Sequence, residues 1–193
     1  MIDAAIALID KLGYERTTVE QIAEAVDVSP RTVAHYFPGK DRLVLSVIDY
    51  YTEAVAAELN RVPVEIAPLR ALLIANLAVL DHAAIHSPPA EANQMVTMLR
   101  TLHLSPSLRP RMTEVRAPAI NADVARRLGV DEDDRRAELV IAVWTGIAAT
   151  AWFGVNSVWE DLRDVPPAEL TALMRNRLLD TFTEFAALSG EVS

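Results

Sequence analysis

Side chains of the types that bind nucleic acid lie close together in SPRTVAHYFPGKDRL, residues 29–43 of a chain that is otherwise acidic. Those that could reach base edges in a major groove, through a guanidinium, a hydroxyl or an imidazole, are Arg31, Thr32 and His35. Tyr36 and Lys40 offer a phenol and an ammonium that suit phosphate oxygens. The net charge of −9 argues against a broad basic surface, so a DNA contact must be local.

These side chains need a rigid helix to position them, and the flanking residues predict one. Ser29 and Pro30 suit an N-cap and a first helical position, so we expect a short helix that ends near Phe37. Before it, Thr18-Val-Glu-Gln21 has the spacing of a capping box, which predicts a helix over residues 18–26. The amide end of that earlier helix, together with the Thr18 hydroxyl, is a second candidate phosphate site.

The remaining N-terminal residues complete a helix-turn-helix. Asp27 lies in the predicted turn, and Asp is one of the few residues other than Gly that tolerates a left-handed backbone. Residues 2–12, which end at Gly13, have the apolar spacing of a supporting helix. The predicted contacts between the two short helices join Val33 and Phe37 to Ile22, Ala23 and Val26. The second helix of such a motif enters the major groove. His35 fits either a groove contact or a solvent-facing position.

The composition favours an all-α globular protein without disulfides. Hydrophobic residues make up 51% of the 193 residues and cysteine is absent, which excludes thiolate metal sites and cysteine nucleophiles and fits a cytoplasmic protein. Residues 139–155 carry no charge, and we interpret them as a buried helix rather than a membrane span. Asp3 and Asp10 lie where an export signal would be basic or apolar.

Proline and glycine positions divide the rest of the chain into further helices. The expected ranges are 40–61, 67–86, 89–104, 106–128, 132–157 and 167–188. We therefore expect two domains: a DNA-binding domain over residues 1–45 with three helices, and a helical effector-binding and dimerisation domain over residues 46–193.

The N-terminal stretch resembles the TetR family of bacterial transcriptional regulators over about 45 residues. The residues that carry the resemblance are Gly13, Thr17-Thr18-Val19, Ile22-Ala23, Val28-Ser29, Thr32, Tyr36-Phe37, Lys40 and Leu43. The S-P-R-T and Y-F-P forms look like a subgroup that is frequent in actinobacterial regulators. The chain departs from the family pattern at Asp27, where a turn glycine is common, and at Ala34, where an aromatic residue is usual. No basic arm precedes the first helix in this sequence, from which we expect either weaker nonspecific DNA binding or a true N-terminus that lies upstream.

The resemblance implies roles for individual residues and partners. It places Thr18, Tyr36 and Lys40 against phosphates, and Arg31, Thr32 and His35 in the groove. It also implies a ligand cavity enclosed by the middle helices, and a homodimer formed through the last two helices, whose two-fold symmetry predicts a pseudo-palindromic operator.

The C-terminal three quarters of the chain have no comparable motif, so the candidate pocket residues rest on side-chain type alone. They are Asn76, His82, Met95, Met98, His103, Asn121, Trp144 and Trp152. The alternative for the Met and Trp residues is an ordinary core. Arginines at 109, 111, 116, 126 and 127 are expected on a solvated face, with an effector anion site as the alternative. His82 and His86 have the spacing of a metal pair, but without a third ligand we expect no metal and no cofactor.

We therefore expect a ligand-responsive, homodimeric repressor that a small apolar or amphipathic effector releases from its operator. Coupling would run through the fourth helix, which links the DNA-binding and effector-binding parts. The alternative is an all-α small-molecule carrier or enzyme whose helix-turn-helix is only structural. Neither a nucleophile paired with a base nor a phosphate loop is visible in the sequence, so we expect no enzymatic activity.

Overall fold

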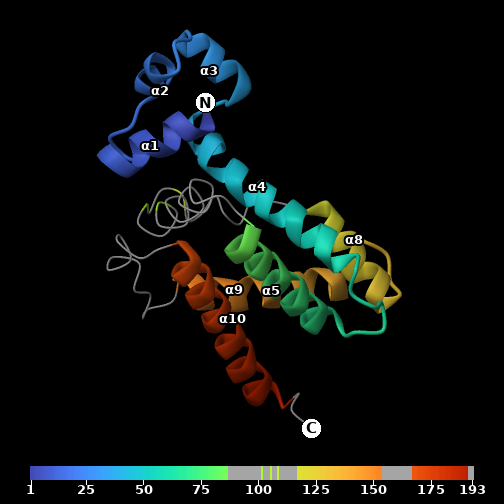
Figure 1. The fold of residues 1–193 in the computed structure, drawn as a ribbon. Helices are drawn as coiled ribbons and strands as arrows, with labels where there is room; N and C mark the ends of the chain where they lie inside the picture. The colour runs from blue at the N-terminus through green and yellow to red at the C-terminus, as the bar shows by residue number, and fades with distance from the viewer. Residues whose placement is uncertain (87–100, 102–104, 106–107, 109–116, 154–166, 191–193) are drawn as a thin grey trace. The chain divides into compact units, whose positions relative to one another are not determined.

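The computed structural model describes residues 1–86, 101, 105, 108, 117–153 and 167–190 (Figure 1). Every regular element in these residues is an α-helix, which confirms the all-α prediction. The helices are α1 (Ile2–Leu12), α2 (Val19–Ala25), α3 (Pro30–Tyr36), α4 (Lys40–Leu59), α5 (Pro68–His86), α8 (Pro118–Leu128), α9 (Arg135–Phe153) and α10 (Pro167–Ser189).

The bounds of two predicted helices differ from those in the structure, and the local chemistry explains where each observed helix begins. We expected one helix over residues 106–128, but it is interrupted at Ala117, the N-cap of α8, which begins at Pro118; proline has no N–H to bond and suits the first position of a helix. Residues 106, 107 and 109–116 lie outside the described residues. We expected another from residue 132, but α9 begins at Arg135. There the Asp134 carboxylate accepts a 2.8 Å hydrogen bond from the Arg136 backbone N–H, as an N-cap does. Of the predicted helix over 89–104 only residue 101 is described, and it is helical; the end of the predicted helix over 132–157 lies outside the described residues.

The described residues fall into two compact units. The first holds residues 1–50 with 101, 105 and 108, and the second holds residues 51–86, 117–153 and 167–190. In the first unit, α1, α2 and α3 bury a small common core of Ala5, Ile22, Ala23 and Val33, and Phe37 packs against it. The predicted packing of Val33 and Phe37 on Ile22 and Ala23 is therefore confirmed.

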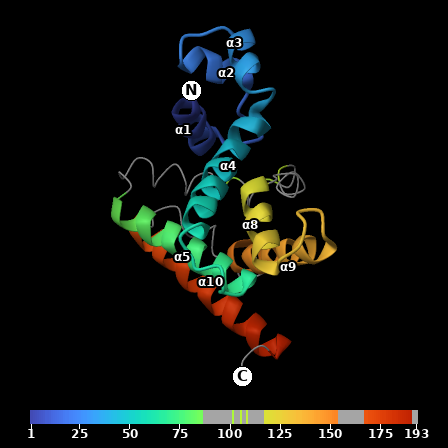
Figure 2. The ribbon, with the colours of Figure 1, turned by 90° about the vertical axis from the view of Figure 1, so that its right-hand side faces the viewer.

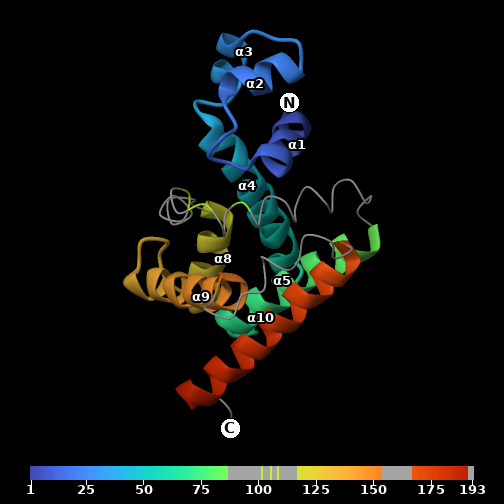
Figure 3. The same ribbon diagram turned by 90° about the vertical axis from the view of Figure 1, so that its left-hand side faces the viewer.

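The second unit is a layered helical bundle. Helix α10 packs along α5 and against α9, and α8 packs against α9 and α5 (Figures 2 and 3). Leu72, Leu170 and Leu178 are completely buried. At the surface, the Arg175 guanidinium donates a 2.8 Å hydrogen bond to the Asp81 carboxylate, which joins α10 to α5.

Helix α9 is only partly buried in the single chain. Trp144, Ile147 and Ala151 lie in the core, whereas Leu139 is 63% exposed. The hydroxyls of Thr145 and Thr150 donate to backbone carbonyls of their own helix, at 2.8 and 2.9 Å. The exposed face of α9 therefore presents methyl groups and small residues to solvent. None of the described helices is long and apolar enough to span a membrane.

Candidate nucleic-acid interface

The N-terminal caps of α2 and α3 are formed as the sequence predicts. The Ser29 hydroxyl accepts a 3.1 Å hydrogen bond from the Thr32 backbone N–H, and Pro30 occupies the first turn. At α2, the Gln21 N–H donates to the Thr18 hydroxyl at 3.3 Å, while the Thr18 N–H donates to the Gln21 side chain at 3.0 Å. This is a complete capping box, which fixes where the helix begins.

The turn between α2 and α3 depends on Asp27. Its φ of 53° lies in the left-handed region, where it is the one residue other than glycine among those described. The turn closes because the Val28 N–H donates to the Ala23 carbonyl at 3.0 Å. The predicted left-handed turn is therefore confirmed, and it sets the direction of α3 relative to α2.

Helix α3 has one buried and one exposed face. Val33 is 1% exposed and packs into the core of the first unit. On the other side Arg31, Ala34 and His35 are exposed, and Tyr36 is 67% exposed. Thr32 is half-buried, and its hydroxyl lies 2.8 Å from that of Ser29. The helix thus presents a cation, an imidazole and a phenol to solvent from a well-fixed backbone.

An acidic side chain lies at the candidate phosphate site of α2. A hydrogen bond from the backbone N–H of Glu20 itself, and a second from the Thr18 hydroxyl, hold the pKa of the Glu20 carboxyl below its usual range. The amide end of α2 therefore already faces a negative charge that belongs to the chain. A phosphate bound at Thr18 would have to displace this carboxylate or share its donors.

Lys40, at the start of α4, is bonded to the loop that precedes α2. Its ammonium donates to the carbonyls of Tyr14, Glu15 and Thr17 at 2.8, 3.3 and 3.2 Å. These three bonds match the three N–H groups of an ammonium. A phosphate contact would therefore require at least one of the bonds to be exchanged. The neighbouring Asp41 carboxylate accepts a short hydrogen bond from the Tyr14 hydroxyl.

Residues 1–47 match the family model of the bacterial regulatory proteins, tetR family. The chain is also 34% identical over 152 residues to the HTH-type transcriptional regulator TcmR of Streptomyces glaucescens, a match that spans 76% of this chain and 67% of TcmR. This chain belongs to the TetR family. It is a DNA-binding transcriptional regulator with an N-terminal helix-turn-helix, as the sequence predicts.

Other similarities to this TetR-family chain are shorter or more distant. The regulator BetI of Brucella anthropi is 42% identical over 60 residues, which span 31% of each chain. The structure of Thermus thermophilus FadR in complex with lauroyl-CoA covers 94% of this chain and 91% of its own, with 17% identity and a TM-score of 0.47.

The second unit of this TetR-family regulator brings two of the predicted pocket residues together. Asn76, 2% exposed, accepts a 2.8 Å hydrogen bond from the Tyr51 hydroxyl and donates to the Leu72 carbonyl at 2.8 Å. The Trp152 ring meets the Tyr51 ring edge-on, with centroids 5.8 Å apart. Burial raises the pKa of Tyr51. Sequence reasoning did not single out Tyr51, because nothing local distinguishes it from Tyr50, which is exposed.

The other predicted pocket residues that the structure describes lie on three different helices, α5, α8 and α9. Trp144 is buried and His82 is exposed on α5. Asn121 donates to the Glu132 carbonyl at 3.0 Å, which supports the turn between α8 and α9. Met95, Met98 and His103 lie outside the described residues. No group of three metal-ligating side chains occurs within the ranges that the structure describes.

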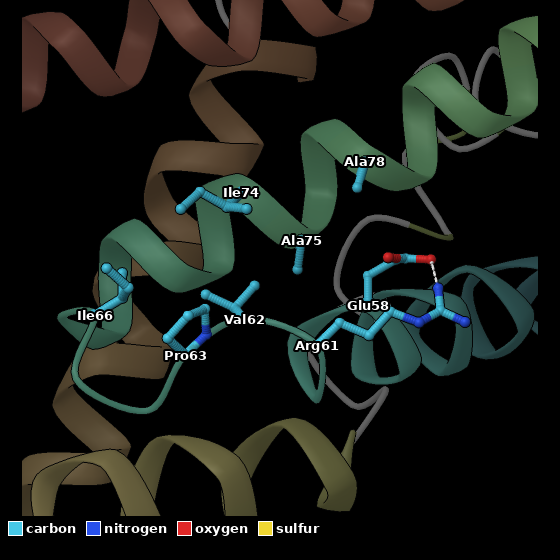
Figure 4. A pocket seen from close by; sticks show the side chains of 8 residues that line it. All are labelled: Glu58, Arg61, Val62, Pro63, Ile66, Ile74, Ala75 and Ala78. Carbon is cyan, nitrogen blue, oxygen red and sulfur yellow. Dashed lines mark hydrogen bonds and ion pairs between the residues drawn. The ribbon is translucent and has the colours of Figure 1, made fainter.

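A small groove lies where α4 joins α5, and none of the predicted pocket residues line it. It holds about 280 Å³ and is lined by Glu58, Arg61, Val62, Pro63, Ile66, Ile74, Ala75 and Ala78. Figure 4 shows the apolar side chains on one side and the Glu58–Arg61 ion pair on the other. The groove is mainly apolar with a charged rim.

Proposed function

We propose that this regulator is a homodimeric repressor, released from a pseudo-palindromic operator by a small apolar or amphipathic effector. The observation that carries the proposal is the division of α3 into a buried face at Val33 and an exposed face at Arg31, Ala34 and His35. Capping at Ser29 fixes this helix, so its exposed side chains have a defined direction in which to meet a major groove.

In this proposal Arg31, Thr32 and His35 contact bases. The exposure of Arg31 and His35 supports this role. The Thr32 hydroxyl is bonded to Ser29, but a hydroxyl offers two acceptor sites and one donor, so it retains capacity for a base edge.

Phosphate contacts are assigned to Thr18, Tyr36 and Lys40. Tyr36 has the clearest support because it is 67% exposed. Lys40 and Thr18 would each exchange an internal hydrogen bond for a phosphate oxygen, which fits a contact formed only on DNA.

Dimerisation is proposed through α9 and α10. The exposed face of α9 includes Leu139 and presents the methyl groups of Thr145 and Thr150, and on α10 Leu179 and Leu188 are 37% and 89% exposed. Exposed apolar surface of this kind favours association. A two-fold dimer would hold two α3 helices about 34 to 36 Å apart, or a multiple of that distance.

The effector is proposed to bind near Tyr51 and Asn76, in an effector-binding domain over residues 46–193 that follows a DNA-binding domain over residues 1–45. A half-buried phenol and a buried amide beside the Trp152 ring suit a ligand that is largely apolar with a few polar atoms. A cytoplasmic location follows from this function.

The test is selection of DNA from a random pool at low salt, followed by affinity measurements on Arg31→Ala, Lys40→Ala and the control Arg70→Ala. Arg70 is exposed on α5 in the second unit. Arg31→Ala should cost about 1 to 3 kcal/mol and relax one base position, whereas Lys40→Ala should weaken all sequences alike and reduce the salt slope by about one. The proposal would be overturned if the selection returned no preferred sequence. It would also be overturned if Arg31→Ala and Arg70→Ala lowered the affinity for DNA equally.

A further inference from the structure

Two adjacent arginines at the end of α8 have opposite environments. Both Arg126 and Arg127 were expected on a solvated face, which holds for Arg126, whose side chain is 51% exposed. For Arg127 the expectation is wrong, since its side chain is 0% exposed. A guanidinium stays charged at any accessible pH and is rarely buried without partners, so its contacts show what this residue does.

Every N–H group of the Arg127 guanidinium is directed at an acceptor. Nε donates to the Asp123 carboxylate at 2.5 Å. Nη2 donates to the Leu59 and Val62 carbonyls at 3.0 and 2.9 Å, and Nη1 to the Pro63 and Ile66 carbonyls at 2.6 and 3.4 Å. A guanidinium has five N–H donors, and these five bonds use all of them. Asp123, 5% exposed, supplies the opposite charge that a buried cation requires.

The four carbonyls belong to the end of α4 and to the loop that leads to α5. The last carbonyls of a helix have no partner within the helix, and the negative end of its dipole favours a cation there. Arg127 supplies the end of α4 with both hydrogen-bond donors and a positive charge. Because Arg127 belongs to α8, these bonds connect α8 to the end of α4. The side chains of Val62, Pro63 and Ile66, whose carbonyls it holds, also line the groove of Figure 4.

The opposite end of α4 is also held by charged groups. Lys40 and Asp41, its first two residues, bond to Tyr14 in the loop between α1 and α2. Helix α4 therefore has fixed contacts to the DNA-binding part at its start and to α8 at its end.

We infer that Arg127 is a positioning residue that, with Asp123, fixes the end of α4 to α8, so that a movement of α8 is passed along α4 to the helix-turn-helix. This inference rests on the proposed coupling of effector binding to DNA release. It assigns that coupling to a specific pair of side chains that neither contacts DNA nor lines the groove.

The matched variants are Arg127→Gln and Arg126→Gln. Both remove a charged partner of Asp123 from the last turn of α8, but only the first removes the bonds to α4. Arg127→Lys is a third variant that keeps the charge and provides three N–H groups in place of five. It also serves as the test protein if Arg127→Gln does not fold.

The main measurement is a distance distribution between spin labels within one chain. The protein has no cysteine, so Glu24→Cys on α2 and Ala119→Cys on α8, both exposed, give two unique labels. The labelled chain is mixed with excess unlabelled chain, so the distance is measured within one chain whether or not the protein dimerises. We expect Arg127→Gln to widen the distribution at least twofold, Arg127→Lys to widen it less, and Arg126→Gln to leave it unchanged.

Hydrogen exchange in the same variants separates positioning from general stability. We expect exchange at residues 56–66 to rise at least tenfold in Arg127→Gln, with little change in α10. The inference would be overturned if the distance distribution kept its width in Arg127→Gln. A rise in hydrogen exchange that is uniform across the second unit would also overturn it. Since neither readout needs DNA or a dimer, failure here is distinguishable from failure of the proposed repressor function.

Discussion

The Lys40 ammonium lies 4.3 Å from the centre of the Tyr14 ring and donates a 2.8 Å hydrogen bond to the carbonyl of the same residue. Tyr14 is buried, and its hydroxyl bonds to Asp41, the next residue of α4. The start of α4 and the loop before α2 are therefore joined by a cation–π contact and by hydrogen bonds in both directions.

Lys40→Ala should consequently destabilise the protein as well as weaken DNA binding. Removing an ammonium from three carbonyls should lower the free energy of unfolding by about 1 to 3 kcal/mol, measured by urea unfolding. Lys40→Arg should retain more stability and more DNA affinity than Lys40→Ala. A stability loss with an unchanged salt slope of DNA binding would show that Lys40 holds the loop and does not contact phosphate.

Glu20→Gln should increase affinity for DNA. The Glu20 carboxylate is ionised at neutral pH and places a negative charge at the amide end of α2, where hydrogen bonds hold its pKa below the usual range. Titration at two salt concentrations measures the effect, which should be similar for all sequences because phosphates carry no sequence information. Glu24→Gln, an exposed change in the last turn of the same helix, is the control, and an equal gain in both variants would contradict a local role for Glu20.

Stability should fall in alkaline solution because of Tyr51. Burial raises the pKa of its hydroxyl in the folded chain, whereas the unfolded chain ionises near the ordinary value of about 10. The contribution of neutral Tyr51 to the free energy of unfolding is therefore fully present below about pH 10. It is lost as the pH rises above this value, because the unfolded chain then ionises first. Urea unfolding at about pH 9 and about pH 11 measures the loss, and Tyr51→Phe should reduce it. An equal loss in Tyr51→Phe would assign the effect to other groups.

The turn residue Asp27 predicts a contrast between two small substitutions. Asp27→Ala should lower the free energy of unfolding by about 1 kcal/mol, because alanine disfavours the left-handed backbone that Asp27 adopts at φ 53°. Asp27→Gly should leave the free energy of unfolding unchanged or raise it, since glycine adopts this conformation without steric cost. Thermal unfolding of both variants checks the order, and equal melting temperatures would show that the turn is not under this constraint.

The sequence predicts the N-terminal unit well because its determinants are local. The Thr18–Gln21 capping box, the Ser29 cap and the Asp27 turn each involve residues no more than a few positions apart, and all three are present. These features also position Arg31 and Tyr36, so the exposed face of the candidate interface could be predicted.

The second unit is harder to predict because its polar contacts join distant residues. Tyr51 and Asn76 are 25 positions apart, and Arg127 and Pro63 are 64 apart. In the sequence Arg127 looks like its neighbour Arg126, and only the tertiary fold places one in the interior and the other in solvent. Side-chain type alone therefore gave a pocket set that omitted Tyr51, which contacts both Asn76 and Trp152 among the described residues.

The length of α4 sets a scale for any signal that crosses it. Its 20 residues correspond to a rod of about 30 Å. A tilt of about 5° at the end held by Arg127 would displace the far end by about 2.5 Å, a large part of the 3.4 Å rise between successive base pairs. In the proposed dimer, very small rotations at the α8 contact would therefore be enough to move a recognition helix out of register with its half-site.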